Sequence, residues 1–176
     1  LYSNWPYDPV KGIAPISNLA IVPFVLVVKN GLAKDYAEFM KVARDNAGKL
    51  GMASGGPGSS NQLVGELFQS ITGVKFVHVP YKGTGAALVD VVSGQVDMLF
   101  DQASASIGHV RSGKLRAIAS SSRARWTALP DVPTFKELGV QDFVIENVTG
   151  LVAPAGTPAD VIAKLHQAAV KALGTA

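Results

Sequence analysis

Glycine and serine gather in residues 54–60, which read Ser-Gly-Gly-Pro-Gly-Ser-Ser. Because glycine carries no Cβ, such a loop allows a ligand to approach the backbone N–H groups closely. Ser59 and Gln62 fit a capping box, so we expect a helix to begin directly after the loop. The start of a helix offers unpaired N–H donors and a partial positive charge, which together suit a carboxylate or a phosphate. A tight turn without a ligand has the same composition, and the phosphate-loop ending Gly-Lys-Ser/Thr is absent.

Two further segments carry polar side chains that suit a binding site. Asp101 directly follows a short apolar run, where it is able to accept a hydrogen bond from a ligand amine or hydroxyl, or to cap a helix. Tyr81 offers an aromatic wall and a hydroxyl donor. Lys82 offers a charge that either neutralises an acidic ligand or is simply solvated. The sequence leaves these alternatives open, and capping is the simpler role for Asp101.

Catalytic and metal sites are disfavoured by the residue types present. The three histidines, His78, His109 and His166, lie far apart and lack the spacing of metal ligands. The chain has no cysteine and no G-x-S-x-G motif, so neither a cysteine nor a serine nucleophile is indicated. No base is paired with a nucleophile in the pattern, which favours binding over catalysis.

The composition is that of a folded protein with a hydrophobic core, with 48% apolar and 16% charged residues among 176. The net charge is +3, and the densest basic stretch, residues 111–125, lacks the interleaved aromatic residues of a nucleic-acid platform. We therefore expect no nucleic-acid partner. The absence of cysteine permits an oxidising compartment. No apolar run reaches the length of a membrane-spanning helix.

A repeated order of strand, loop and helix is expected to position the polar residues. Apolar runs at 50–53, 75–79 and 96–100 are each followed by a polar loop and a stretch of helical periodicity, and a further run at 115–119 closes the series. This alternation predicts a parallel sheet with helices on its faces, and it places the strand-to-helix loops on one edge. The three loops are residues 54–60, 80–84 and 101–104. Ligands of open α/β sheets bind at that edge, so the convergence is a stronger indication than any single loop.

The segments outside this series are less regular. Residues 19–28 are an apolar run containing Pro23, which predicts either one buried strand or two short strands joined at the proline. The other expected elements are a helix over 32–47, strands over 143–147 and 150–153, and a helix that Thr157 caps.

Short motifs spread over the whole chain share their order with one known family. The motifs are Pro6-Tyr7-Asp8-Pro9-Val10, Gly58-Ser59-Ser60, Gly65-Glu66-Leu67-Phe68, His78-Val79-Pro80-Tyr81-Lys82-Gly83, Phe100-Asp101, Gly113-Lys114-Leu115-Arg116-Ala117, Leu129-Pro130-Asp131-Val132-Pro133-Thr134 and Ala153-Pro154-Ala155-Gly156-Thr157-Pro158. In these residues the chain resembles the Bug family, the periplasmic solute-binding proteins of tripartite tricarboxylate transporters.

The resemblance implies a periplasmic-binding-protein (Venus-flytrap, type II-like) fold of the α/β class, and a binding protein rather than an enzyme. One complete lobe with a parallel-rich sheet is expected over residues 25–147, with residues 1–24 and 148–176 as parts of the other lobe. The implied ligand is a small organic acid or amino-acid-like solute, the implied partners are integral-membrane transporter subunits, and neither cofactor nor metal is implied. The implied ligand-binding residues are Ser54, Gly55, Gly58, Ser59, Ser60, Tyr81, Gly83, Thr84 and Asp101.

Two other classes stay open beside this one: a ligand-sensing receptor lobe for a signalling partner and, with less support, an α/β enzyme built on the same edge. The resemblance also implies that a strand with its own carboxylate loop precedes Leu1 and that the first lobe is cut near Ala176. We therefore expect apolar residues of that lobe, such as Leu19 and Val152, to be exposed. The open sheet edge and this surface predict that the chain associates with a second copy.

Overall fold

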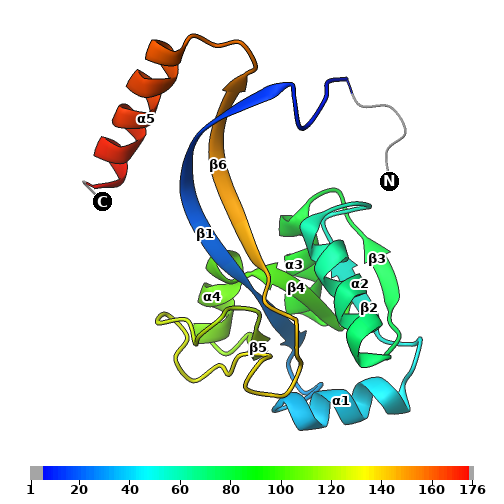
Figure 1. The fold of residues 1–176 in the computed structure, drawn as a ribbon. Coiled ribbons are helices and arrows are strands. Elements are labelled where there is room, and N and C mark those ends of the chain that lie inside the picture. The colour runs from blue at the N-terminus through cyan, green and yellow to red at the C-terminus, as the bar shows by residue number, and fades with distance from the viewer. Residues whose placement is uncertain (1–5, 175–176) are drawn as a thin grey trace. The chain divides into compact units, whose positions relative to one another are not determined.

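The computed structural model describes residues 6–174. These residues form two compact units, one from Val22 to Asn147 and one that combines the residues before Val22 with those from Val148 onward. Figure 1 shows the elements of each unit. Within the described part of the chain, no helix combines the length and apolar character needed to cross a membrane.

A mixed sheet with the strand order β3-β2-β4-β1-β5 forms the centre of the unit 22–147. Its strands are β1 (Ile13–Lys29), β2 (Gly51–Ser54), β3 (Val77–Pro80), β4 (Met98–Gln102) and β5 (Leu115–Ser120). Strand β2 is parallel to β3 and β4, whereas β1 is antiparallel to both β4 and β5. Strands β2 to β5 therefore point the same way, and β1 lies between β4 and β5 in the opposite direction (Figure 1). The expected α/β fold with a parallel-rich sheet is confirmed.

Helices cover both faces of this sheet. Helices α1 (Tyr36–Asp45) and α2 (Ser60–Thr72) pack on one face, and α3 (Thr84–Ser93) and α4 (Ala103–Arg111) pack on the other. The first face is rich in aromatic side chains: Phe68 contacts Phe39, Phe76, Phe100, Phe135 and Phe143. Because the side chains of a strand alternate between faces, Phe100 enters this cluster and its neighbour Asp101 points to the α3 and α4 side.

The ends of the helices follow from local residues. Ser59 is the N-cap of α2, and Gly73 ends this helix in the left-handed conformation, with φ 75°. The first helix begins at Tyr36 rather than at residue 32, because the Asp35 side chain accepts the Glu38 N–H at 2.9 Å and caps the helix there.

The second unit contains the first part of β1 together with β6 (Glu146–Pro154) and α5 (Ala159–Leu173). Strand β6 pairs with β1, and it is one strand where two were expected. Strand β1 likewise runs through Pro23 without a break. Thr157 does not cap α5, because its hydroxyl donates to the Pro154 carbonyl at 2.7 Å.

Apolar side chains of this second unit are exposed, as expected. Leu19 is 37% exposed and Val152 is 52% exposed. Helix α5 has no buried residue, although the His166 ring lies 2.9 Å from the Ile16 carbonyl oxygen.

Candidate ligand-binding site

Three helices begin on one edge of the sheet in the unit 22–147. Ser54 pairs with Pro80 and Ala53 pairs with Leu99, so β2, β3 and β4 end side by side. Helices α2, α3 and α4 start within a few residues of those strand ends. Neither Gly83 nor Gln102, the N-caps of α3 and α4, makes a side-chain capping bond. The first N–H groups of a helix have no partner within the helix, so this edge concentrates donors that suit an anion.

The side chain of Asn61 connects the start of α2 to the start of α3 and to β4. Asn61 lies in the first turn of α2 and is 3% exposed. Its Nδ2 donates to the Phe100 carbonyl of β4 at 2.7 Å, and its Oδ1 accepts from the Thr84 hydroxyl of α3 at 3.0 Å. Both bonds are buried or half-buried, so one amide group helps to hold α2, α3 and β4 in place.

Backbone contacts hold the loops after β2 and β3 against each other. The Tyr81 N–H donates to the Ser54 carbonyl at 3.0 Å, and the Gly83 N–H donates to the Gly55 carbonyl at 3.1 Å. A Cβ on Gly55 would lie only 2.9 Å from Thr84 Oγ1, so glycine is required for this close approach. Gly56 is held at φ 117°, a conformation that side chains rarely adopt.

The residues expected to bind the ligand differ in their exposure. Ser54 and Asp101 are fully buried. The other seven are accessible at the edge: Gly55, Gly58, Ser59, Ser60, Tyr81, Gly83 and Thr84. The ring of Tyr81 packs against the apolar residues under α3, and its hydroxyl donates to the Asp90 carboxylate at 2.7 Å. The accessible donors of this edge are therefore mainly backbone N–H groups and small hydroxyls.

Asp101 carries an isolated buried carboxylate at the end of β4. Neither of its oxygens makes a hydrogen bond with the described residues, and neither does the Ser106 hydroxyl of α4. Burial raises the pKa of Asp101 to about 6, and the nearby Gln102 N–H and Ser106 hydroxyl offset only part of that rise. Asp101 is not the N-cap of α4, because Gln102 occupies that position. The capping role is thus wrong, and a ligand contact stays a prediction.

Three residues of this edge were not identified from the sequence as site residues. Asn61 lies inside the expected helix, where nothing in the sequence distinguishes it from a surface residue. Gln62 is expected only to complete the capping box. His78 is expected from the sequence to lie on a strand and to face either the cleft or a helix, and its Nε2 lies 2.6 Å from the Ser54 hydroxyl. The available signal for His78 was its position two residues before the end of β3, a strand that was expected to point to the same edge as β2.

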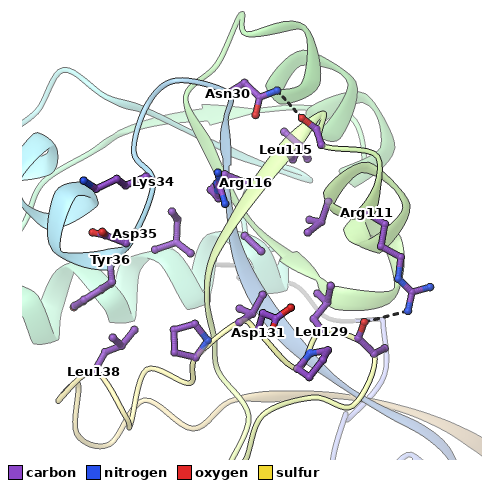
Figure 2. A pocket seen from close by; sticks show the side chains of 18 of the residues that line it. Asn30, Lys34, Asp35, Tyr36, Arg111, Leu115, Arg116, Leu129, Asp131 and Leu138 are labelled. Atoms are coloured by element: carbon purple, nitrogen blue, oxygen red, sulfur yellow. Dashed lines mark hydrogen bonds between the residues drawn. The ribbon is translucent and has the colours of Figure 1, made fainter.

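A separate hollow of about 880 Å³ lies along β5. Figure 2 shows its lining, with Lys34, Arg111 and Arg116 around it. None of the residues expected to bind the ligand lines this hollow. Among residues 6–174, no group of histidine, aspartate and glutamate side chains is arranged to hold a metal ion.

Comparison with known proteins defines the class of the fold and then the family. The structure of Rpa4515 from R. palustris with adipate has a TM-score of 0.90 at 31% identity. The match covers 96% of this chain and 57% of Rpa4515. The structure of MatC from Rhodopseudomonas palustris with bound malate has a TM-score of 0.87 at 34% identity over 96% and 57% of the two chains. The periplasmic binding protein BugD gives a TM-score of 0.87 at 32% identity over 99% and 62% of the two chains. The fold is therefore that of a periplasmic binding protein.

The family model described as "Tripartite tricarboxylate transporter family receptor" matches residues 1–176, and the chain belongs to that family. The protein BugT of Bordetella pertussis is 36% identical over 168 residues, which cover 95% of this chain and 52% of BugT. A protein of Agrobacterium vitis is 33% identical over 174 residues, with 98% and 50% coverage. The chain spans about half the length of these relatives. The family is one of receptors, and BugD is described as a periplasmic binding protein.

Proposed function

We propose that this chain contributes the carboxylate-binding edge of a periplasmic receptor, which captures a small organic acid or amino-acid-like solute for a tripartite tricarboxylate-type transporter. The observation that carries the proposal is the buried Asn61, which links the start of α2 to the start of α3 and to β4, the strand that leads directly into α4. Integral-membrane subunits of the transporter would receive the solute from this receptor.

The chemistry of the edge supports an acidic ligand. The start of α2 offers the hydroxyls of Ser59 and Ser60 and the first N–H groups of the helix to one carboxylate group, whereas the N–H groups of Gly56 and Gly58 are bonded to side chains beneath the loop. Thr84 and the uncapped start of α3 lie beside them. Hydrogen bonds to a charged group are stronger than those between neutral groups, so a few such donors are enough to hold a carboxylate. The relatives Rpa4515 and MatC, whose structures contain adipate and malate, are similar to this chain over nearly its whole length.

A catalytic role for this edge has less support. Ser54 and His78 lie within hydrogen-bond reach, as a nucleophile and its base do. However, the Ser54 hydroxyl is completely buried and also contacts the loop backbone at Gly56. The second ring nitrogen of His78 faces the Gln62 amide instead of a carboxylate that would stabilise a charged imidazole. Binding therefore explains the arrangement better than nucleophilic chemistry does.

A thermal-shift screen of organic acids, followed by calorimetry, tests the proposed function in the longest natural chain that contains these residues. Adipate, malate, citrate and glutamate are the first probes, and adipamide, which has the length of adipate without its charges, is the control. At about one hundred times its dissociation constant, a true ligand should add roughly 2.7 kcal/mol to the free energy of unfolding. Binding of adipamide as tight as that of adipate would contradict recognition by carboxylate.

A further inference from the structure

A chain of hydrogen bonds lies beneath the loop 54–58 and connects its two ends through α2 and β3. The Gly58 N–H donates to Gln62 Oε1 at 2.7 Å. Gln62 Nε2 lies 3.5 Å from His78 Nδ1, and His78 Nε2 lies 2.6 Å from Ser54 Oγ. Ser54 Oγ in turn accepts the Gly56 N–H at 3.1 Å. The chain therefore begins and ends on glycines of the loop.

The direction of every bond follows from the Gly58 N–H, which can act only as a donor. The Gly58 N–H must face the carbonyl oxygen of the Gln62 side chain, so the NH₂ group of Gln62 faces His78. His78 Nδ1 is then the acceptor, and the ring proton is on Nε2, from which it is donated to Ser54 Oγ. Ser54 directs its own proton toward the Gly56 carbonyl, 3.3 Å away. One neutral tautomer of His78 satisfies all of these groups.

Backbone bonds already hold the carbonyls of Ser54, Gly55 and Gly56, and the chain of bonds adds side-chain support at the N–H groups of Gly56 and Gly58. Gly56 and Gly58 adopt φ values of 117° and 77°, and glycine loses more conformational freedom on ordering than any other residue. A loop that is already ordered before the ligand arrives avoids this entropic cost at the moment of binding. Ser54 is fully buried and His78 is half-buried, so their contact is shielded from water.

We propose that His78, in the neutral form with its proton on Nε2, is the positioning residue that holds the loop 54–58 in its anion-binding conformation. It acts through Ser54 on one side and through Gln62 on the other, without contact to the ligand. The inference rests on the proposed function, because it assigns to His78 the preorganisation of that carboxylate site.

Two substitutions separate the hydrogen bonds of His78 from its bulk. His78→Gln keeps an N–H donor toward Ser54 and an acceptor toward Gln62, whereas His78→Leu removes both. His109→Leu is the matched control, because His109 lies on α4 and is not part of the chain of bonds. All variants are made in the longest natural chain that contains these residues, and circular dichroism melting checks that each is folded.

Adipate is the probe for calorimetry, with malate as the second. His78→Leu should weaken binding roughly tenfold, and His78→Gln should remain within about threefold of the parent. The control should bind as the parent does. Equal affinity of the parent and His78→Leu, or equal losses in the Leu and Gln variants, would overturn the proposal.

A second measurement needs no ligand and therefore separates this inference from the proposed function. Long-range ¹H–¹⁵N correlation spectra distinguish a protonated from an unprotonated ring nitrogen, and the His78 signals are assigned by their loss in His78→Gln. We expect an unprotonated Nδ1 and a protonated Nε2 at neutral pH. A protonated Nδ1 would overturn the assignment, whether or not adipate binds. If neither acid binds while the tautomer is as stated, the ligand class of the proposed function fails and the role of His78 in ordering the loop stands.

Discussion

The side-chain amide of Asn61 donates a hydrogen bond to the backbone carbonyl of Phe100 across 2.7 Å, which joins the start of α2 to the end of β4. Asn61→Ala should therefore lower the free energy of unfolding by roughly 1–3 kcal/mol, because the Phe100 carbonyl is left buried without its donor. Asn30→Ala removes a bond of the same kind, to the Gly113 carbonyl at 2.7 Å, at an exposed site and should cost less. Urea unfolding of both variants makes the comparison, and equal losses would contradict a special role for Asn61.

Gly55 is expected to be irreplaceable, because a Cβ there would lie 2.9 Å from Thr84 Oγ1 and 3.2 Å from the Thr84 nitrogen. Gly55→Ala should cost about 1–3 kcal/mol in stability, as overpacking of a tight contact does. It should also weaken adipate binding, because it separates the loop from α3. Gly108→Ala on α4 is the control, since a Cβ there meets no atom within 4 Å. A control that destabilises as much as Gly55→Ala would show that the Thr84 contact is not the cause.

The Ser60 hydroxyl and the Gly58 backbone are predicted to belong to the carboxylate site. Ser60→Ala should weaken binding of adipate by roughly 1.5–3 kcal/mol if one charge-assisted hydrogen bond is lost. Gly58→Val should do the same for a different reason, because Gly58 has a φ of 77° that valine does not adopt readily. Ser112→Ala, at the exposed C-cap of α4, is the control. Unchanged affinities in both site variants would remove the loop from the site.

Asp101 should make stability depend on pH in the direction opposite to that of an ordinary carboxylate. Burial raises the pKa of Asp101 from 3.8 to about 6, so the folded state binds its proton more tightly than the unfolded state. Its protonation therefore favours folding below pH 4, and this advantage is lost as the pH rises from about 4 to above 6. The loss amounts to roughly 3 kcal/mol for a shift of this size.

Asp101→Asn removes the titrating proton while keeping a similar shape. The difference in free energy of unfolding between this variant and the parent should therefore grow in favour of the variant between pH 4 and pH 7. Urea unfolding at a series of pH values measures it. A constant difference across that range would mean that Asp101 does not ionise in a buried state. Comparison of adipate and glutamate binding to the variant then tests whether Asp101 also contacts the ligand.

The sequence was sufficient to predict the loops after β2 and β3 and their shared edge, but not the contacts between them. The expected loop 101–104 is wrong, because β4 continues to Gln102 and α4 begins at Ala103. Short apolar runs and the Ser59 cap predict β2, α2 and the direction of the chain through them. Periodicity does not tell which strands are neighbours, so the position of β1 between β4 and β5 had no signal. The Tyr81 hydroxyl pairs with Asp90, which lies within the following helix α3. This pairing depends on side-chain geometry that only the folded chain defines.

The position of β1 also has a consequence for the order of folding. Residues Phe24 to Val28 of β1 pair with β4 and β5, whose residues are Met98–Gln102 and Leu115–Ser120. A ribosome adds about 5–20 residues per second, so several seconds pass between the synthesis of β1 and that of its neighbours β4 and β5. Pro23 interrupts that run with a residue that cannot donate to a neighbouring strand, which hinders pairing between nascent chains. We therefore expect Pro23 to lower the tendency of nascent chains to pair through this strand.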